Sequence, residues 1–111
     1  AMGVRVERSE DPYKGTWVEY RDHGWKFKDR TRLLSSVNDL ETLKIILDYI
    51  ENWNLKDVDG NPVPFDRSKG EALLDNLDDR YVIPWLIGSW FEARSRRIEV
   101  PLGPSPTSSA T

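Results

Sequence analysis

Alternating apolar and polar residues form the first clear pattern of the chain, in residues 17–28. The apolar positions are Val18, Tyr20, Trp25 and Phe27, and polar residues separate them on either side of a short Asp-His-Gly segment. A period of two is typical of β-strands, and Gly24 suits the left-handed backbone of a short turn. The sequence therefore predicts a β-hairpin that turns these four side chains toward the core. By the same alternation, Trp17 is expected on the outer face.

Two segments with helical spacing follow the predicted hairpin. Residues 39–53 begin after Asn38, and Glu41 lies three positions further on, which is the pattern of a helix capping box. The apolar stripe of this segment consists of Leu40, Leu43, Ile46, Leu47, Ile50 and Trp53. A shorter helix is predicted from Ser68, where Glu71 completes a second capping box and three leucines supply the apolar side.

The last predicted helix, residues 80–96, is apolar around nearly its whole circumference. Its apolar residues are Tyr81, Val82, Ile83, Trp85, Leu86, Ile87, Trp90 and Phe91. A helix of this kind is either central in a large core or shared with a partner. A hairpin and two other helices offer too little surface to cover it, which favours self-association. The predicted partner contacts are Trp17, Trp85, Ile87, Trp90 and Phe91.

These elements predict a mainly α fold of the α+β class, an N-terminal β-hairpin followed by a small bundle of about three helices. The opening Ala-Met-Gly resembles a cloning scar, and residues 1–12 are expected to be flexible. Residues 13–100 are predicted to form a single folded domain. Residues 101–111 are rich in Pro, Ser and Thr and are expected to be a disordered tail.

Composition narrows the function classes. The net charge of −3 argues against nucleic acid as a partner, because phosphate binding requires a basic surface. No apolar run reaches the roughly 18 residues of a membrane helix, so no membrane partner is expected. The chain of 111 residues has no cysteine and a single histidine, His23, which leaves few ligands for a transition metal.

The segment Asn-Trp-Asn-Leu-Lys-Asp-Val-Asp-Gly-Asn-Pro-Val-Pro-Phe-Asp, residues 52–66, is rich in oxygen ligands. A calcium loop of the EF-hand type requires glycine at its sixth position and glutamate at its twelfth. Counting from Asp57 places Gly60 fourth, and counting from Asp59 places Pro64 sixth, so neither register fits. Gly60 and its neighbours are instead the residue types of a tight turn, with prolines that keep the exit extended. The segment is therefore interpreted as a turn.

The same segment carries a family resemblance. A helix leading into this turn, a short helix and then Ile-Pro-Trp-Leu-Ile-Gly-Ser-Trp-Phe-Glu-Ala resembles the tail assembly chaperones of long-tailed bacteriophages. The likeness covers residues 40–96. The residues that correspond to the recurring motif of that family are Trp53, Asn54, Leu55, Asp57, Asp59, Gly60, Val63 and Pro64.

The resemblance implies a non-enzymatic role without a cofactor, in the cytoplasm of a bacterial host during phage assembly. Such a chaperone self-associates, binds the hydrophobic tape-measure protein and helps to recruit tail-tube subunits. A structural component of the virion, such as a minor tail or head–tail connector protein, is the alternative. An enzyme would need a pocket that collects polar groups such as Asp57, Asp59, Arg80 and His23, and no motif in the sequence indicates one.

Overall fold

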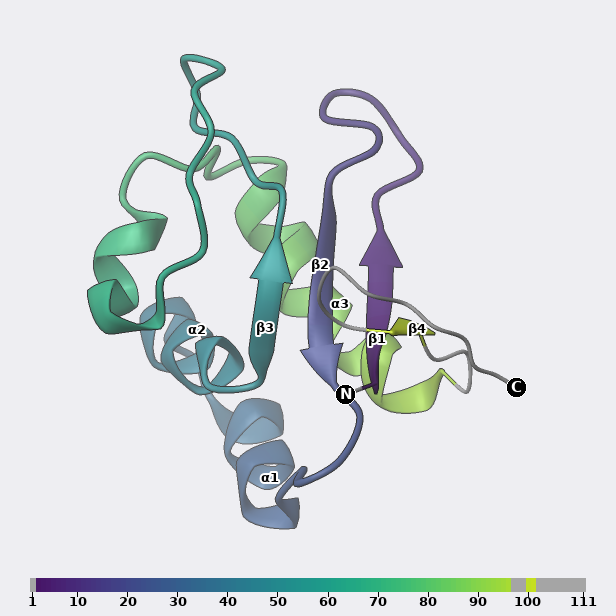
Figure 1. Cartoon of the computed structure of the whole chain (residues 1–111). Helices are drawn as coiled ribbons and strands as arrows, with labels where there is room; N and C mark the ends of the chain where they lie inside the picture. The colour runs from purple at the N-terminus through teal and green to yellow at the C-terminus, as the bar shows by residue number, and fades with distance from the viewer. Residues whose placement is uncertain (1, 97–99, 102–111) are drawn as a thin grey trace.

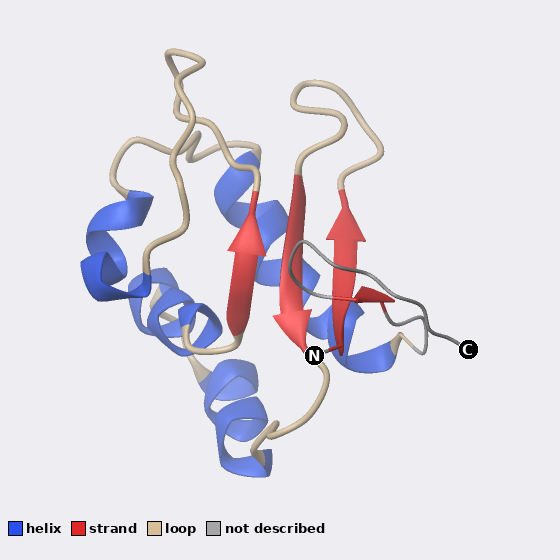
Figure 2. Cartoon of the chain, in the orientation of Figure 1, coloured by secondary structure: helices blue, strands red, loops and turns tan. Residues whose placement is uncertain are grey.

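The computed structural model describes residues 2–96 and 100–101, and its centre is an antiparallel sheet (Figures 1 and 2). The strands are β1 (Met2–Glu7), β2 (Trp17–Arg21), β3 (Ile50–Trp53) and the two-residue β4 (Val100–Pro101), in the order β3-β2-β1-β4. Val6 lies opposite Val18, which in turn lies opposite Trp53. This register aligns the apolar side chains of three strands on one face.

Helix α3 (Val82–Ser95) packs across that apolar face and lies behind the sheet in Figure 1. The sheet contributes Val4, Val6, Val18 and Tyr20 to the core, all buried. The Tyr20 hydroxyl lies 2.7 Å from Ser89 Oγ of α3, so this buried phenol has a hydrogen-bond partner. Burial raises the pKa of Tyr20. The sheet face and α3 together form the main core.

Three shorter helical elements flank the sheet: α1 (Phe27–Ser35), α2 (Asp39–Leu47) and the 3₁₀ segment η1 (Arg67–Leu74). The Asn38 side chain accepts hydrogen bonds from the amides of Leu40 and Glu41, which confirms Asn38 as the N-cap of α2. At η1 the cap is Asp66, which accepts from the Ser68 amide at 3.0 Å. The prediction that Ser68 caps this helix was wrong.

The predicted β-hairpin and helical bundle are wrong, because the strands form a sheet. Strand β2 pairs with β1 on one side and β3 on the other, and residues 27–35 are helical. Trp25 is half-buried, whereas Phe27, predicted in the core, is 71% exposed. The alternation identified strand β2 correctly. It predicted pairing with the residues that follow β2 in the sequence, whereas β2 pairs with residues 2–7 and 50–53. The fold is a small α+β structure with a central sheet.

The predicted long helix 39–53 is also wrong, because α2 ends at Leu47 and residues 50–53 form β3. Ile50 and Trp53 are buried, as the helical stripe required, but they reach the core from a strand. A register shift opposite Glu19 and Tyr20 allows both side chains to face inward despite their spacing of three. The bulge therefore gives this strand the apolar spacing of three residues that is typical of a helix.

The N-terminal residues belong to the sheet. Residues 2–7, predicted to be flexible, form β1 between β2 and β4, and Val4 and Val6 are 6% and 0% exposed. The prediction of flexibility was therefore wrong for these residues. Pro101, expected in the tail, pairs with Met2 through β4, and residues 102–111 of the predicted tail lie outside the described structure.

Arginine side chains cover carbonyl groups at both sides of the sheet. The Arg67 guanidinium donates to the carbonyl oxygens of Leu47 and of Ile50 in β3, the first at 3.0 Å. Arg96 donates to the carbonyl oxygen of Arg5 in β1 at 3.1 Å. Unpaired carbonyls on a strand edge are a template for pairing with another chain, so both contacts protect the sheet.

Candidate interaction surfaces

Within the segment 52–66, residues 57–61 form a tight turn, as predicted, whereas residues 52 and 53 belong to β3. The Asp57 amide donates to the Asn61 carbonyl at 2.9 Å, and Gly60 has a φ of +84°. One Asp57 carboxylate oxygen accepts from the amides of Asp59 and Asn61, at 2.9 and 3.0 Å. Asp57 therefore shapes its own turn, and the Asp59 carboxylate is exposed beside it.

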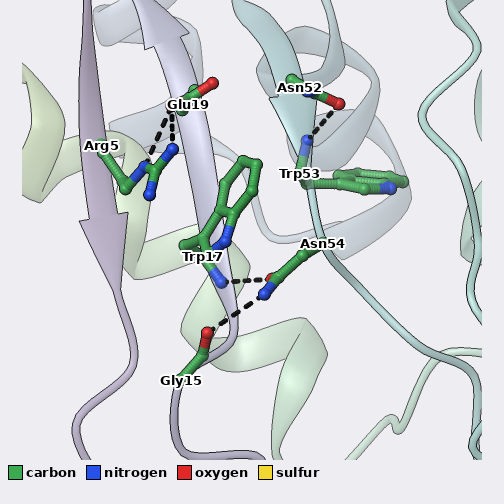
Figure 3. Close-up of polar contacts among 7 residues, drawn as sticks. All are labelled: Arg5, Gly15, Trp17, Glu19, Asn52, Trp53 and Asn54. Atoms are coloured by element: carbon green, nitrogen blue, oxygen red, sulfur yellow. Dashed lines mark hydrogen bonds and ion pairs between the residues drawn. The ribbon is translucent and has the colours of Figure 1, made fainter. Parts of the chain in front are cut away.

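The other motif residues hold the surrounding segments together. Trp53 is 4% exposed, and its indole N–H donates to the Val63 carbonyl at 2.6 Å. Leu55 is 1% exposed, whereas Pro64 lies on the surface. Asn54 accepts from the Trp17 amide at 2.6 Å and donates to the Gly15 carbonyl at 3.2 Å (Figure 3). The Trp-Asn-Leu sequence is thus part of the framework of the fold.

The four polar residues that an enzyme would gather lie in different places. Asp57 and Asp59 belong to the turn, and Arg80 lies in the neighbouring loop of residues 75–81 at the same end of the molecule. His23 instead follows β2 and lines a hollow with Arg21 and Arg94. The turn and the segment after β2 lie at opposite ends of the molecule in Figure 1. The geometry therefore does not assemble the hypothetical catalytic group.

Helix α3 is sheltered by the sheet on one side, contrary to the expected surplus of exposed apolar surface. Trp90 is 1% exposed, so the prediction that it contacts a partner was wrong. Its ring lies 5.0 Å from that of Trp25 and 5.6 Å from that of Tyr49. Trp85, Ile87 and Phe91 are half-buried and pack against the edge of the core. The sheet supplies the covering surface that a hairpin could not.

Trp17 lies on the outer face of the sheet, where Arg5 covers part of it (Figure 3). The Arg5 guanidinium carbon is 4.1 Å from the Trp17 ring centroid, a cation–π contact. The same guanidinium donates to one carboxylate oxygen of Glu19 at 3.0 and 2.6 Å, and Glu19 is 4% exposed. Trp17 is half-buried in this arrangement.

The large exposed apolar side chains of the described residues include Leu40, which was predicted in the apolar stripe of residues 39–53 and is 42% exposed, so its assignment to the core was wrong. The others are Phe27, Leu34, Val37 and Val58. Leu34, Val37 and Leu40 follow one another from the end of α1 to the start of α2, with exposures of 65%, 101% and 42%. We call these three residues the α1–α2 patch. The spacing of seven between Phe27 and Leu34 was the available signal, because it places both on one side of a helix.

A basic region with an aromatic floor lies where α1, α3 and the segment after β2 meet. Two hollows of about 190 and 250 Å³ share Trp25 and Arg94. The smaller hollow, which we call the basic hollow, is lined by Trp25, Lys26, Phe27, Arg30, Trp90 and Arg94. Tyr49 fixes α1 beside it, because its hydroxyl donates to the Asp29 carboxylate at 2.7 Å and accepts from the Lys26 amide at 2.9 Å.

The end of the molecule opposite the basic hollow is acidic, and hydrogen bonds hold its loops together. The Val58 amide donates to the Asn76 carbonyl at 3.0 Å, and the Tyr13 hydroxyl donates to the Asp78 carboxylate at 2.9 Å. These bonds join three loops. Hydrogen bonds from the Tyr81 amide and the Tyr13 hydroxyl lower the pKa of Asp78. The carboxylates of these loops are those of Glu10, Asp11, Asp57, Asp59, Asp75, Asp78 and Asp79.

No helix in residues 2–96 is long and apolar enough to cross a membrane. In the same part of the chain, no three His, Asp or Glu side chains gather as ligands for a metal ion. Comparison of the chain with protein-family models, with curated proteins and with solved structures finds no match.

Proposed function

We propose that this protein is a tail assembly chaperone of a long-tailed bacteriophage. In this role it acts in the host cytoplasm, binds the hydrophobic tape-measure protein and helps to recruit tail-tube subunits, without catalysis. The sequence resemblance over residues 40–96 supports the family. Of the polar residues considered for catalysis, Asp57, Asp59 and Arg80 lie on loops at one end of the molecule and His23 lines a hollow at the other, and this separation supports a binding role.

The observation that carries the proposal is the α1–α2 patch. A helical client with an apolar stripe buries this patch without a defined sequence, because the hydrophobic effect is non-directional. Full burial of one leucine or valine side chain contributes about 1.5–3 kcal/mol, so three such contacts give weak binding after association costs. Many copies along one extended client gain by multivalency, and each copy remains easy to displace by a tube subunit.

Co-expression with the tape-measure protein encoded in the same phage genome tests the proposal. We expect the parent protein to keep the tape-measure protein in the soluble fraction and to co-purify with it. The double variant Leu34→Ser/Val37→Ser should lose both effects, since it removes most of the α1–α2 patch. Lys28→Ser changes another exposed position of α1 and serves as the matched control.

Purified virions provide the second readout. A chaperone is displaced as the tube forms, so mass spectrometry of purified virions should not detect the protein. Its presence at a fixed copy number would support the alternative, a structural component of the virion. A tape-measure protein that is equally insoluble with and without this chain would refute the proposed function.

A further inference from the structure

We propose that copies of this protein associate head to tail, with the Val58–Asp59 tip of one copy in the basic hollow of the next. The proposal specifies the self-association that the proposed function includes, but it does not depend on binding of the tape-measure protein. Its physical basis is a molecule whose two ends each offer apolar surface and carry opposite charge.

The tip is an apolar side chain next to a carboxylate that is available for a partner. Val58 is 57% exposed at the end of the turn, and Asp59 is exposed beside it. Asp57 uses one carboxylate oxygen within the turn, whereas Asp59 forms no ion pair with a described residue. The bond from the Val58 amide to Asn76 and the Asp57 contacts hold this tip in shape. A rigid tip loses little conformational freedom on docking.

The basic hollow offers the matching chemistry. The half-buried Trp25 and the exposed Phe27 line it with aromatic surface, and Lys26, Arg30 and Arg94 place positive charge around it. These three cations form no ion pair within the described part of the chain. The indole N–H of Trp90 is buried and has no hydrogen-bond acceptor among the described residues. Val58 would thus meet aromatic rings, and Asp59 would meet cations.

The two ends of the molecule also carry opposite net charge. The acidic loops carry seven carboxylates against Arg8, Lys14, Lys56 and Arg80, counted over residues 8–16, 54–63 and 75–81. The region around the basic hollow, counted over residues 21–35 and 92–96, carries Arg21, Lys26, Lys28, Arg30, Arg32, Arg94 and Arg96 against Asp22, Asp29 and Glu92. α3 runs from one end to the other, so the two regions face in opposite directions (Figure 1). Contact between two acidic ends or two basic ends is therefore disfavoured, and contact between an acidic end and a basic end is favoured.

The geometry also selects the kind of assembly. Because the two surfaces are different and lie at opposite ends, the contact is heterologous, and repeated contacts generate a ring or an open helical array. Pairing through the strand edges is the main competing route. Arg67 and Arg96 cover carbonyls on β3 and β1 and hinder that route.

Two neutral double variants test the proposal on the purified full chain. The tip variant is Val58→Ser/Asp59→Asn, and the hollow variant is Arg30→Gln/Arg94→Gln. We expect the mass of the parent in sedimentation velocity to rise with protein concentration and to fall with added salt, because ions screen exposed charges. Each variant alone should associate at least about tenfold more weakly.

An equimolar mixture of the two variants gives the decisive measurement. The intact tip of the hollow variant fits the intact hollow of the tip variant, so the mixture should form one-to-one dimers and nothing larger. Glu7→Lys and Lys69→Glu, two exposed charge reversals outside both surfaces, should assemble like the parent. Circular dichroism checks that every variant is folded.

Three outcomes would overturn the head-to-tail contact. They are a parent that stays monomeric at all concentrations, folded variants that assemble like the parent, and a mixture that remains monomeric. None of these outcomes bears on whether the α1–α2 patch keeps the tape-measure protein soluble, so failure of this proposal is distinguishable from failure of the proposed function.

Discussion

Helices α1 and α3 are opposite in composition and in exposure. α3 is apolar on most sides, but the fold covers much of this surface. Its buried residues are Val82, Ile83, Leu86, Ser89, Trp90 and Ala93. α1 is mostly polar, yet Leu33 is its only buried residue, and both Phe27 and Leu34 project into solvent. The apolar surface available for contact is therefore on the more polar helix.

The difference shows that apolar content alone does not identify an interaction surface. α3 lies against the sheet, which buries its apolar side chains, and its half-buried Trp85 and Phe91 pack on the core margin. α1 sits at the rim and is fixed by Leu33 and the Tyr49 hydroxyl, and its other apolar side chains, Phe27 and Leu34, remain exposed. Position in the fold decides which apolar residues are available.

Trp90→Ala should have the largest effect on stability. The substitution removes a fully buried ring that contacts Trp25, Tyr49 and Phe91, so we expect the free energy of unfolding to fall by about 3–5 kcal/mol. Chemical denaturation measures the change. Trp85→Ala, at a half-buried position of the same helix, should cost clearly less. Equal losses at the two positions would contradict the described packing of α3.

Leu33→Ala tests the attachment of α1 and should cost about 2 kcal/mol, the lower end of the range for leucine in a core. Because Leu33 is the only buried residue of α1, hydrogen exchange should accelerate most in residues 27–35. Uniform acceleration across α3 as well would show that α1 and the core unfold as one unit.

Asn38→Ala should destabilise the protein by about 1 kcal/mol, since it removes the acceptor of the Leu40 and Glu41 amides in the first turn of α2. Thermal unfolding of the parent and the variant measures the shift. Asn38→Asp keeps an acceptor at the cap and should restore the parent stability. A melting curve of the alanine variant identical to that of the parent would exclude a stabilising cap.

Leu34→Ser should have the smallest effect, within about 0.5 kcal/mol, because the side chain is 65% exposed. Chemical denaturation under the conditions used for Trp90→Ala provides the comparison. A loss as large as that of Leu33→Ala would mean that Leu34 is covered in the protein in solution.

Local signals in the sequence predicted several features of the fold. Asn38 was found as a cap, Val18 and Tyr20 as core positions of a strand, and residues 57–61 as a turn, because each depends on neighbours in the chain. The order of the sheet was not predictable in this way. It depends on the pairing of residues 2–7 with residues 17–21. Val4 and Val6 do alternate with Arg5 and Glu7, but so short an alternation does not specify which strand the segment pairs with.

The candidate surfaces were harder to predict for a related reason. Trp90 and Phe27 are both aromatic residues in helices, and nothing local distinguishes the buried one from the exposed one. Their fates depend on whether a sheet face lies nearby, which is a property of the tertiary structure. The basic hollow likewise combines residues 25–30 with residues 90–94, far apart in the sequence.

Strand β1 lies inside the sheet, between β2 and β4, and this position has a practical consequence for expression and labelling. A shortened version that starts at Ser9 would lack Val4 and Val6 and would leave β2 with an open side. Such a truncation should yield aggregated material. Affinity tags and fluorophores therefore require a spacer ahead of Met2, so that bulky groups do not interfere with strand pairing.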